Sequence, residues 1–198
     1  MTDAVSRPSA GPPSGGPAAA VSLLIERGLT VGTAESLTGG LLCAALTSVP
    51  GSSDTVRGGV VSYATDLKAA LLGVSRERLS DVGAVDALVA EQMAQGVRRL
   101  LGTDVGLATT GVAGPGPADG VPAGTVHIAV SGPWAARPTT RALTLGGDRD
   151  AVRSATVAAV LDLLTELLSG APVDTPRPSR TPMPDDLREC PNSSNPST

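Results

Sequence analysis

Residues 29–48 read LTVGTAESLTGGLLCAALTS, and this stretch decides the fold class of the chain. Its first part, Leu29–Ala34, is a short apolar run that predicts a strand. Its last part, Thr38–Ser48, has apolar residues at the spacing of a helix. A strand that gives way to a helix within a few residues is the repeating unit of α/β proteins. The same alternation extends along the chain in both directions.

Strand and helix segments follow one another on either side of this stretch. The preceding helix ends at Gly28, and a long helix is expected between a capping Asp86 and a terminating Gly102. A shorter helix is expected with Thr65 as its cap and Gly73 as its stop. The expected helices are 18–27, 38–48, 66–72, 87–101 and 148–168, and the expected strands are 29–34, 56–63, 105–109, 125–131 and 139–145.

The order of these segments predicts the architecture. Alternating strands and helices place helices on both faces of a sheet, and two successive strands near the end make that sheet mixed. We predict an α/β fold: a three-layer α/β/α single domain over residues 18–170 with a mixed, mostly parallel sheet. Functional groups in such sheets gather in the loops beyond the carboxyl ends of the strands, here 34–40, 63–68 and 109–120.

The composition excludes several classes of protein. The net charge of −4 provides no basic field for nucleic acid, and the aromatic content of 1% leaves little for base stacking. No apolar run reaches the roughly 18 residues that a membrane helix needs. Residues 1–17 lack the layout of a secretory signal, and with 171–198 they are expected to be disordered tails. Cys43 and Cys190 do not form a metal or disulfide pattern. We expect a cytoplasmic protein without nucleic-acid or membrane partners.

Lys68 is the only lysine among the fifteen lysine and arginine residues of the chain. Arginine stays protonated in proteins, whereas a lysine that is buried or near positive charge can lose its proton and act as a base. With Thr65 as the helix cap, Lys68 falls in the first helical turn, where the helix dipole disfavours a cation. The alternative is a surface lysine left by chance.

Ser36 stands where the first strand gives way to its helix, just ahead of Thr38, Gly39 and Gly40. Glycines allow a ligand to approach the backbone, and free N–H groups at a helix start can hold an anion or an oxyanion. A serine at this place could attack a carbonyl held there. The structural alternative is that the serine or threonine is only a helix cap.

Further candidates come from three other segments. Tyr63 is the sole tyrosine, Thr110 and Gly111 open a Gly-rich turn after a strand, and Arg149 and Arg153 begin the last helix. Arginines at a helix N-terminus suit a phosphate. Each candidate also has a structural reading: a satisfied sheet tyrosine, an ordinary tight turn, and arginines in solvent.

His127, the only histidine, lies among small and apolar residues of an expected strand, which favours a core or sheet role. The chain also lacks a G-x-S-x-G nucleophile elbow. If this chain is a serine hydrolase, the base is therefore better assigned to Lys68 than to histidine. The two residues are far apart in sequence, so the fold must bring them together.

These segments together resemble the CinA C-terminal domain family, whose characterised members are nicotinamide-nucleotide amidohydrolases (NMN deamidases). The resemblance covers about residues 20–168, in the family's order. The matching stretches are TAESLTGGLLCAALTSVPGSS, RGGVVSYATDLKAALLGV, GAV before a long helix, LATTGVAGPG, GTVHIAV and GDRDAVR.

The resemblance implies deamidation of nicotinamide mononucleotide (NMN) in pyridine nucleotide recycling, with no cofactor and no metal. It implies a catalytic pair of Ser36 and Lys68, with Tyr63 and Thr110 as auxiliary hydroxyls. Substrate-binding groups are expected at Gly111 and in the glycine turn formed by Thr38, Gly39 and Gly40. One further substrate-binding group is expected at either Arg149 or Arg153, between which the sequence does not decide.

The chain also departs from the family. Leu37, Val82 and Asp86 replace the cysteine, histidine and serine that are frequent there, and Pro117–Asp119 replaces a more glycine-rich turn. The chain has no room for the N-terminal molybdopterin-binding-like domain of many members, so the stand-alone form is expected. A homodimer is expected as well. The rival interpretation is a non-catalytic nucleotide-binding or regulatory module with the same loops.

Overall fold

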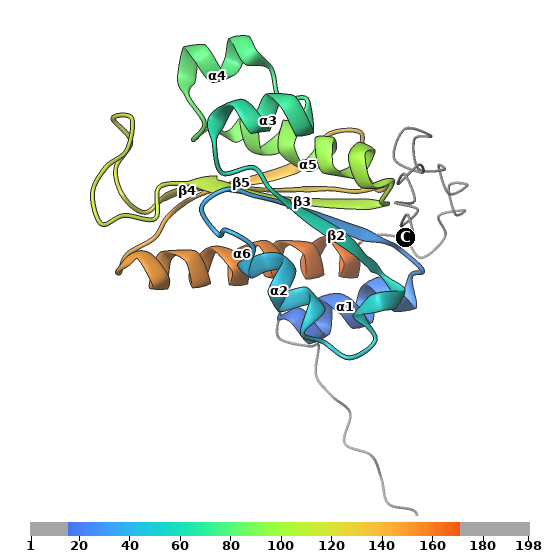
Figure 1. Cartoon of the computed structure of the whole chain (residues 1–198). Helices are drawn as coiled ribbons and strands as arrows, with labels where there is room; N and C mark the ends of the chain where they lie inside the picture. Colours follow the sequence, from blue (N-terminus) through green and yellow to red (C-terminus); the bar gives the residue numbers. More distant parts are fainter. Residues whose placement is uncertain (1–15, 171–198) are drawn as a thin grey trace, which may run out of the picture.

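Five strands lie side by side in the order β2-β1-β3-β4-β5 (Figure 1). β1 pairs in parallel with both β2 and β3, whereas β3 with β4 and β4 with β5 pair antiparallel. Four of these five strands therefore run in one direction, and the predicted mixed, mostly parallel sheet is confirmed. The strands are β1 Val31–Glu35, β2 Val56–Val61, β3 Val105–Gly111, β4 Thr125–Ser131 and β5 Thr139–Thr144.

Helices cover both faces of this sheet, as predicted (Figure 1). One face carries α1 Pro17–Glu26, α2 Leu41–Thr47 and α6 Arg149–Gly170, and the other carries α3 Thr65–Leu72, α4 Arg76–Val82 and α5 Ala87–Leu101. A 3-10 turn, Ser52–Asp54, precedes β2. This computed structural model describes residues 16–170, so the predicted tails, apart from residues 16 and 17, lie outside the described residues.

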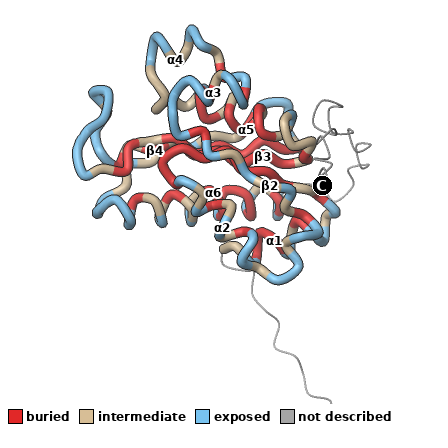
Figure 2. The backbone as a smooth tube through the Cα atoms, viewed as in Figure 1, coloured by how far each residue is buried: buried red, intermediate tan, exposed pale blue. Residues whose placement is uncertain are grey.

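The sheet separates two hydrophobic clusters (Figure 2). The larger cluster packs β1, β3 and β4 against α1, α2 and α6. The smaller one lies beneath α5 and contains Val89, Met93 and the strand residues Ala34, Ala108 and Ala129. Aliphatic and alanine side chains fill both, which agrees with an almost aromatic-free composition. No helix in the described part of the chain is both long and apolar enough to cross a membrane.

α5 has the ends that the sequence predicts. The Asp86 side chain accepts hydrogen bonds from the N–H groups of Leu88 (3.0 Å) and Val89 (3.2 Å), and Gly102 closes the helix in the left-handed region at φ 59°. A Cβ placed on Gly96 of α5 would lie 2.0 Å from the carbonyl oxygen of Leu72. Glycine at this position therefore lets α3 pack tightly against α5, and α3 is the helix that carries Lys68.

Three local predictions were wrong. α2 begins at Leu41 rather than Thr38, because the preceding residues form a turn. Thr65 is the first residue of α3 and not its cap, which is Ala64. α4 was not predicted, because its segment RERLSDV carries only one large apolar side chain on its inner face. The helix is capped by Ser75, whose hydroxyl accepts from the N–H of Arg78 at 3.2 Å.

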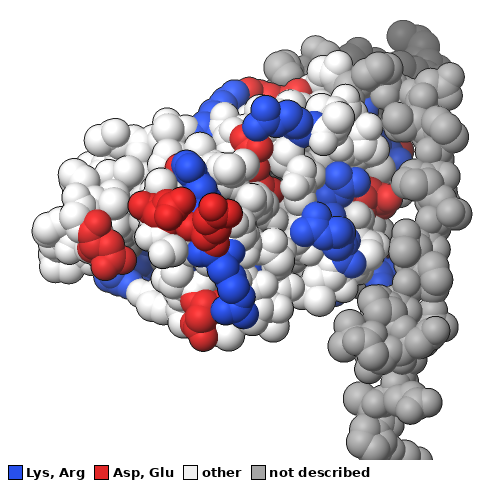
Figure 3. All heavy atoms as spheres, turned by 90° about the horizontal axis from the view of Figure 1, so that it is seen from above, with Lys and Arg blue, Asp and Glu red and all other residues white. Residues whose placement is uncertain are grey.

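The surface above α3, α4 and α5 carries both signs of charge. Figure 3 shows arginine side chains lying among aspartate and glutamate on this face of the described residues, without a continuous basic area. One ion pair here joins Arg78 and Asp86 at 2.7 Å. This mixed distribution agrees with the modest net charge of the whole chain.

Candidate active site

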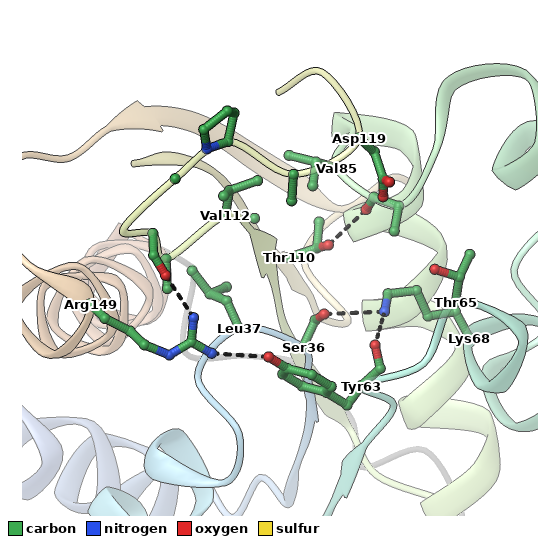
Figure 4. A pocket seen from close by; sticks show the side chains of 17 residues that line it. Ser36, Leu37, Tyr63, Thr65, Lys68, Val85, Thr110, Val112, Asp119 and Arg149 are labelled. Carbon is green, nitrogen blue, oxygen red and sulfur yellow. Dashed lines mark hydrogen bonds between the residues drawn. The ribbon is translucent and has the colours of Figure 1, made fainter. Parts of the chain in front are cut away.

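The loops that leave β1, β2 and β3 at their carboxyl ends meet around one pocket of about 470 Å³ (Figure 4). This is the edge of the sheet where the sequence placed the functional loops. Clefts of this size hold small ligands in many proteins. The pocket is lined by Ser36, Leu37, Tyr63, Thr65, Lys68, Ala84, Val85, Thr110, Gly111, Val112, Ala113, Gly114, Gly116, Pro117, Ala118, Asp119 and Arg149.

Lys68 and Ser36 lie in contact at the base of this pocket. Lys68 Nζ is 3.1 Å from Ser36 Oγ, although 32 residues separate the two along the chain. Ser36 follows β1 directly, and its N–H donates to the carbonyl of Thr109 on β3 at 2.9 Å. Lys68 is the fourth residue of α3, and helical side chains lean toward the N-terminus of their helix. The fold therefore brings together the two groups that the sequence singled out.

The Lys68 ammonium is fully buried, with 0% of the residue exposed. Nζ also donates to two carbonyl oxygens at the end of β2, those of Ser62 (2.7 Å) and Tyr63 (3.3 Å). No carboxylate is within ion-pair distance of it in the described residues. Burial lowers the pKa of Lys68 from 10.5 to about 8. Desolvation is the cause of this lower pKa, as expected for a lysine removed from water.

Glu35 is the important residue that the sequence analysis missed. It ends β1 and is completely buried. One carboxylate oxygen accepts from the N–H groups of Gly40 (2.9 Å) and Leu42 (3.0 Å), and the other accepts from the N–H of Cys43 (2.8 Å) and more weakly from the Thr33 hydroxyl (3.3 Å). The carboxylate thus occupies the N-terminus of α2 and fixes the turn that follows Ser36. An acidic residue between a strand and a Gly-Gly helix start was the available signal.

This arrangement corrects the expected anion cradle at Thr38, Gly39 and Gly40. The Gly40 N–H is bonded to Glu35, and the Gly39 N–H donates to the Ser36 carbonyl at 3.1 Å. The Thr38 hydroxyl pairs with that of Thr109 at 2.8 Å and is buried. None of the three lines the pocket. Within residues 16–170, the backbone N–H groups of Leu37 and Thr38 have no protein acceptor.

The two arginines that the sequence could not separate have different surroundings. Arg149 lines the pocket, where its guanidinium donates to the Gly114 carbonyl (2.9 Å) and to the Tyr63 hydroxyl (3.0 Å). Arg153 lies one turn along α6 and donates to the carbonyls of Leu37 (3.1 Å) and Thr38 (3.0 Å). Arg149 thus faces the space where a ligand would lie, while Arg153 ties the turn after Ser36 to α6.

The proposed auxiliary hydroxyls are not bonded to the Ser36–Lys68 pair. Tyr63 is 59% exposed, and its hydroxyl contacts Arg149 (Figure 4). The Thr110 hydroxyl donates to the carbonyl of Ala84 at 2.7 Å. Thr110 therefore anchors the loop before α5 against β3. Its neighbour Gly111 lines the pocket as well, and a Cβ there would lie 2.5 Å from the carbonyl oxygen of Thr125.

His127 lies on β4 opposite Thr110 and does not line the pocket. Its Nδ1 is buried and has no hydrogen-bond partner within the described residues. The sheet position expected from the sequence is confirmed.

A family model described as the CinA C-terminal domain matches residues 17–168. The chain belongs to this family. It is 49% identical over 152 residues to a CinA-like protein of Frankia casuarinae, and 48% identical over 147 residues to one of Gloeobacter violaceus. These matches cover 77% and 74% of the chain but 35% and 34% of the relatives, so the chain spans about a third of their length.

Solved structures of the CinA superfamily share the fold. A superfamily protein from Klebsiella pneumoniae superimposes with a TM-score of 0.74 at 34% identity, covering 77% of this chain and 95% of that one. A competence/damage inducible protein from Agrobacterium tumefaciens gives 0.71 at 38% identity, with 74% and 90% covered. The resemblance to the CinA C-terminal domain family and the fold class are both confirmed. Membership is consistent with hydrolase activity, and the names of these relatives specify no substrate.

Proposed function

We propose that this CinA C-terminal domain is an amidohydrolase that converts NMN to nicotinate mononucleotide and ammonia through Ser36 and Lys68. The observation that carries the proposal is the 3.1 Å contact between Ser36 Oγ and a fully buried lysine Nζ that has no anionic partner in the described residues. A buried amine beside a serine hydroxyl is one of the known ways of activating a serine nucleophile.

In the structure Lys68 Nζ donates to Ser36 Oγ and to the carbonyls of Ser62 and Tyr63, which are three acceptors for the three N–H groups of the ammonium. Loss of one proton leaves two N–H donors for the two carbonyls and a lone pair that can accept the hydroxyl proton of Ser36. A pKa of about 8 keeps a useful fraction of the amine neutral near physiological pH while leaving it basic enough to accept a proton.

The reaction then proceeds in two balanced steps. Lys68 takes the Ser36 proton as Oγ attacks the carboxamide carbon, and the protonated lysine returns that proton to the departing nitrogen, which leaves as ammonia. Water, deprotonated by Lys68, then attacks the acyl-serine ester; the acyl C–Oγ bond breaks, the lysine returns the proton to Ser36 Oγ, and the acid product leaves and ionises to the carboxylate. The N–H group of Leu37 follows Ser36 directly, belongs to a residue that lines the pocket and lacks a protein acceptor in the described residues, so it is our candidate for stabilising the oxyanion.

Arg149 is our candidate for the phosphate of the nucleotide. Its guanidinium lies in the pocket wall and uses two of its N–H groups on neutral oxygens, those of Gly114 and Tyr63, so its charge has no carboxylate partner in the described residues. A guanidinium has five N–H donors, and phosphate is a preferred partner. Arg153 is the weaker candidate for this role, because it does not line the pocket and its donors hold the turn after Ser36.

The experiment that tests this function is ammonia release from NMN by the full chain and two variants. Lys68→Arg keeps a cation but cannot act as a base near neutral pH, and Ser36→Ala removes the nucleophile. We expect Lys68→Arg to lose on the order of 10²–10⁴-fold in kcat, as removal of a general base does, and Ser36→Ala to lose at least as much, while the thermal unfolding of both variants remains cooperative. Near-normal turnover by Lys68→Arg would reject the assignment of Lys68 as the general base. Saturable NMN binding without ammonia release by the unaltered chain would favour a nucleotide-binding module instead.

A further inference from the structure

Asp119 is an acidic group in the pocket that the proposed chemistry does not use. Among the residues that line the pocket, three carry charge: Lys68 at its base, Arg149 in one wall and Asp119. Figure 4 shows Asp119 and Arg149 on opposite sides of Ser36. The pocket is therefore polarised, with a cation on one side of the nucleophile and an anion on the other.

The backbone holds Asp119 in a defined position. Ala118 and Val121 exchange two backbone hydrogen bonds of 3.1 and 2.9 Å, which makes Asp119 and Gly120 the two central residues of a tight hairpin. Both have positive φ, 49° for Asp119 and 76° for Gly120, as the type I′ turn of an Asp-Gly pair requires. The turn that departs from the family pattern in sequence thus presents a carboxylate to the pocket.

The Asp119 carboxylate has no hydrogen bond and no ion pair with any residue in the described range 16–170. An unpaired carboxylate in a pocket is available to a cation on the ligand. A neutral ligand group would gain much less from it.

We infer that Asp119 selects substrates whose ring carries a positive charge, namely oxidised N-alkyl pyridinium carboxamides, over their neutral reduced counterparts. This inference rests on the proposed amidohydrolase function for the position of the carboxamide at Ser36. With the carboxamide at Ser36 and the phosphate at Arg149, the ring nitrogen that bears the ribose lies between these two groups, inside the pocket that Asp119 also lines. NMN thus brings a cationic ring and an anionic phosphate into a pocket that offers one carboxylate and one guanidinium.

The test compares NMN with its reduced form, which has the same ribose, phosphate and carboxamide but an uncharged ring. Dissociation constants for both nucleotides are measured on the full chain and on the Asp119→Asn variant. The same measurements are repeated with Ser36→Ala added to each of these two proteins, because this substitution prevents turnover during the titration. Asparagine tolerates positive φ, so the hairpin is preserved. Asp162→Asn, an exposed position on α6 away from the pocket, is the control for the change in net charge.

We expect Asp119→Asn to weaken NMN binding about fivefold, the effect of one ion pair in a solvent-accessible site. Binding of reduced NMN should change by less than about twofold, and the difference should shrink in high salt. Equal weakening of both nucleotides, which a contact to the ribose hydroxyls would cause, overturns the inference. So does unchanged binding of both.

Failure of this inference is distinguishable from failure of the proposed function. If the unaltered chain releases ammonia from NMN but binds both nucleotides independently of ring charge, only the role of Asp119 is rejected. If it prefers the oxidised nucleotide but releases no ammonia, only the hydrolase function is rejected. If neither nucleotide binds saturably, both proposals are rejected.

Discussion

The turnover of NMN should rise with pH through a single ionisation near pH 8. In the folded chain, burial lowers the pKa of Lys68 from 10.5 to about 8, and the active form of a general base is the one without its proton. The neutral fraction of such an amine is about 9% at pH 7 and about 91% at pH 9. We therefore expect kcat/KM to increase about tenfold between these pH values and then to level off.

The assay is ammonia release from NMN between pH 6.5 and 9.5 at constant ionic strength, with release in enzyme-free samples subtracted. Cys43 needs a control, because burial raises the pKa of its thiol and it contacts the Glu35 region. Cys43→Ala should keep the same profile. A kcat/KM that is independent of pH over this range, or that falls as pH rises, would refute the assignment of a neutral lysine base.

Two further predictions follow from the contacts around Ser36. Glu35→Gln should lower the free energy of unfolding by about 2–4 kcal/mol in urea titrations, because an amide NH₂ would face backbone donors in a buried site. The control is Glu77→Gln, on the exposed face of α4, which should change the free energy of unfolding by less than about 0.5 kcal/mol. Equal effects of the two substitutions would contradict the role of Glu35. Arg149→Gln should raise KM for NMN about 10–100-fold with little loss of stability. Arg153→Gln should chiefly destabilise the fold, and a larger rise in KM for this variant than for Arg149→Gln would exchange their roles.

Much of the fold could be predicted because local signals and tertiary structure agree. α5 lies between Asp86 and Gly102 as expected, since its cap and its amphipathic pattern both point to the same ends. The strand ends lie within two residues of the expected ones, because apolar runs end at polar or glycine-rich segments. The edge of the sheet where the pocket lies could be anticipated from these ends. Helix α4 was missed because its stability depends on a cap and an ion pair rather than on an apolar face.

The site was predictable in its residue types and less so in its contacts. A single lysine and a serine at a strand-to-helix junction are visible in the sequence, but their 3.1 Å contact depends on the packing of α3 against α5. Arg149 and Arg153 have the same local environment in sequence, and only the turn of α6 between them directs one to the pocket. The use of the α2 N-terminus by Glu35 was not predicted, because free helix N–H groups can donate either to a ligand or to a carboxylate of the protein.

The pairing of Tyr63 with Arg149 has a similar origin. The two residues are 86 positions apart, and no local pattern links a tyrosine after β2 to the start of α6. Their contact forms part of the pocket wall together with the carbonyl of Gly114. The loop after β3, which was expected to be one of the three functional loops, provides most of the remaining wall and the unpaired carboxylate of Asp119, which was not predicted.

The state of the Lys68 amine can be measured directly, because the chain contains no other lysine. Protein labelled with ¹³C-lysine gives one side-chain Cε signal in NMR, which needs no assignment, and its chemical shift can be followed from pH 6 to 11. The account predicts a titration midpoint near pH 8 in the folded protein and a return of the midpoint to about 10.5 in denaturant. A midpoint at about 10.4 in the folded protein, the value of a solvated lysine, would contradict it.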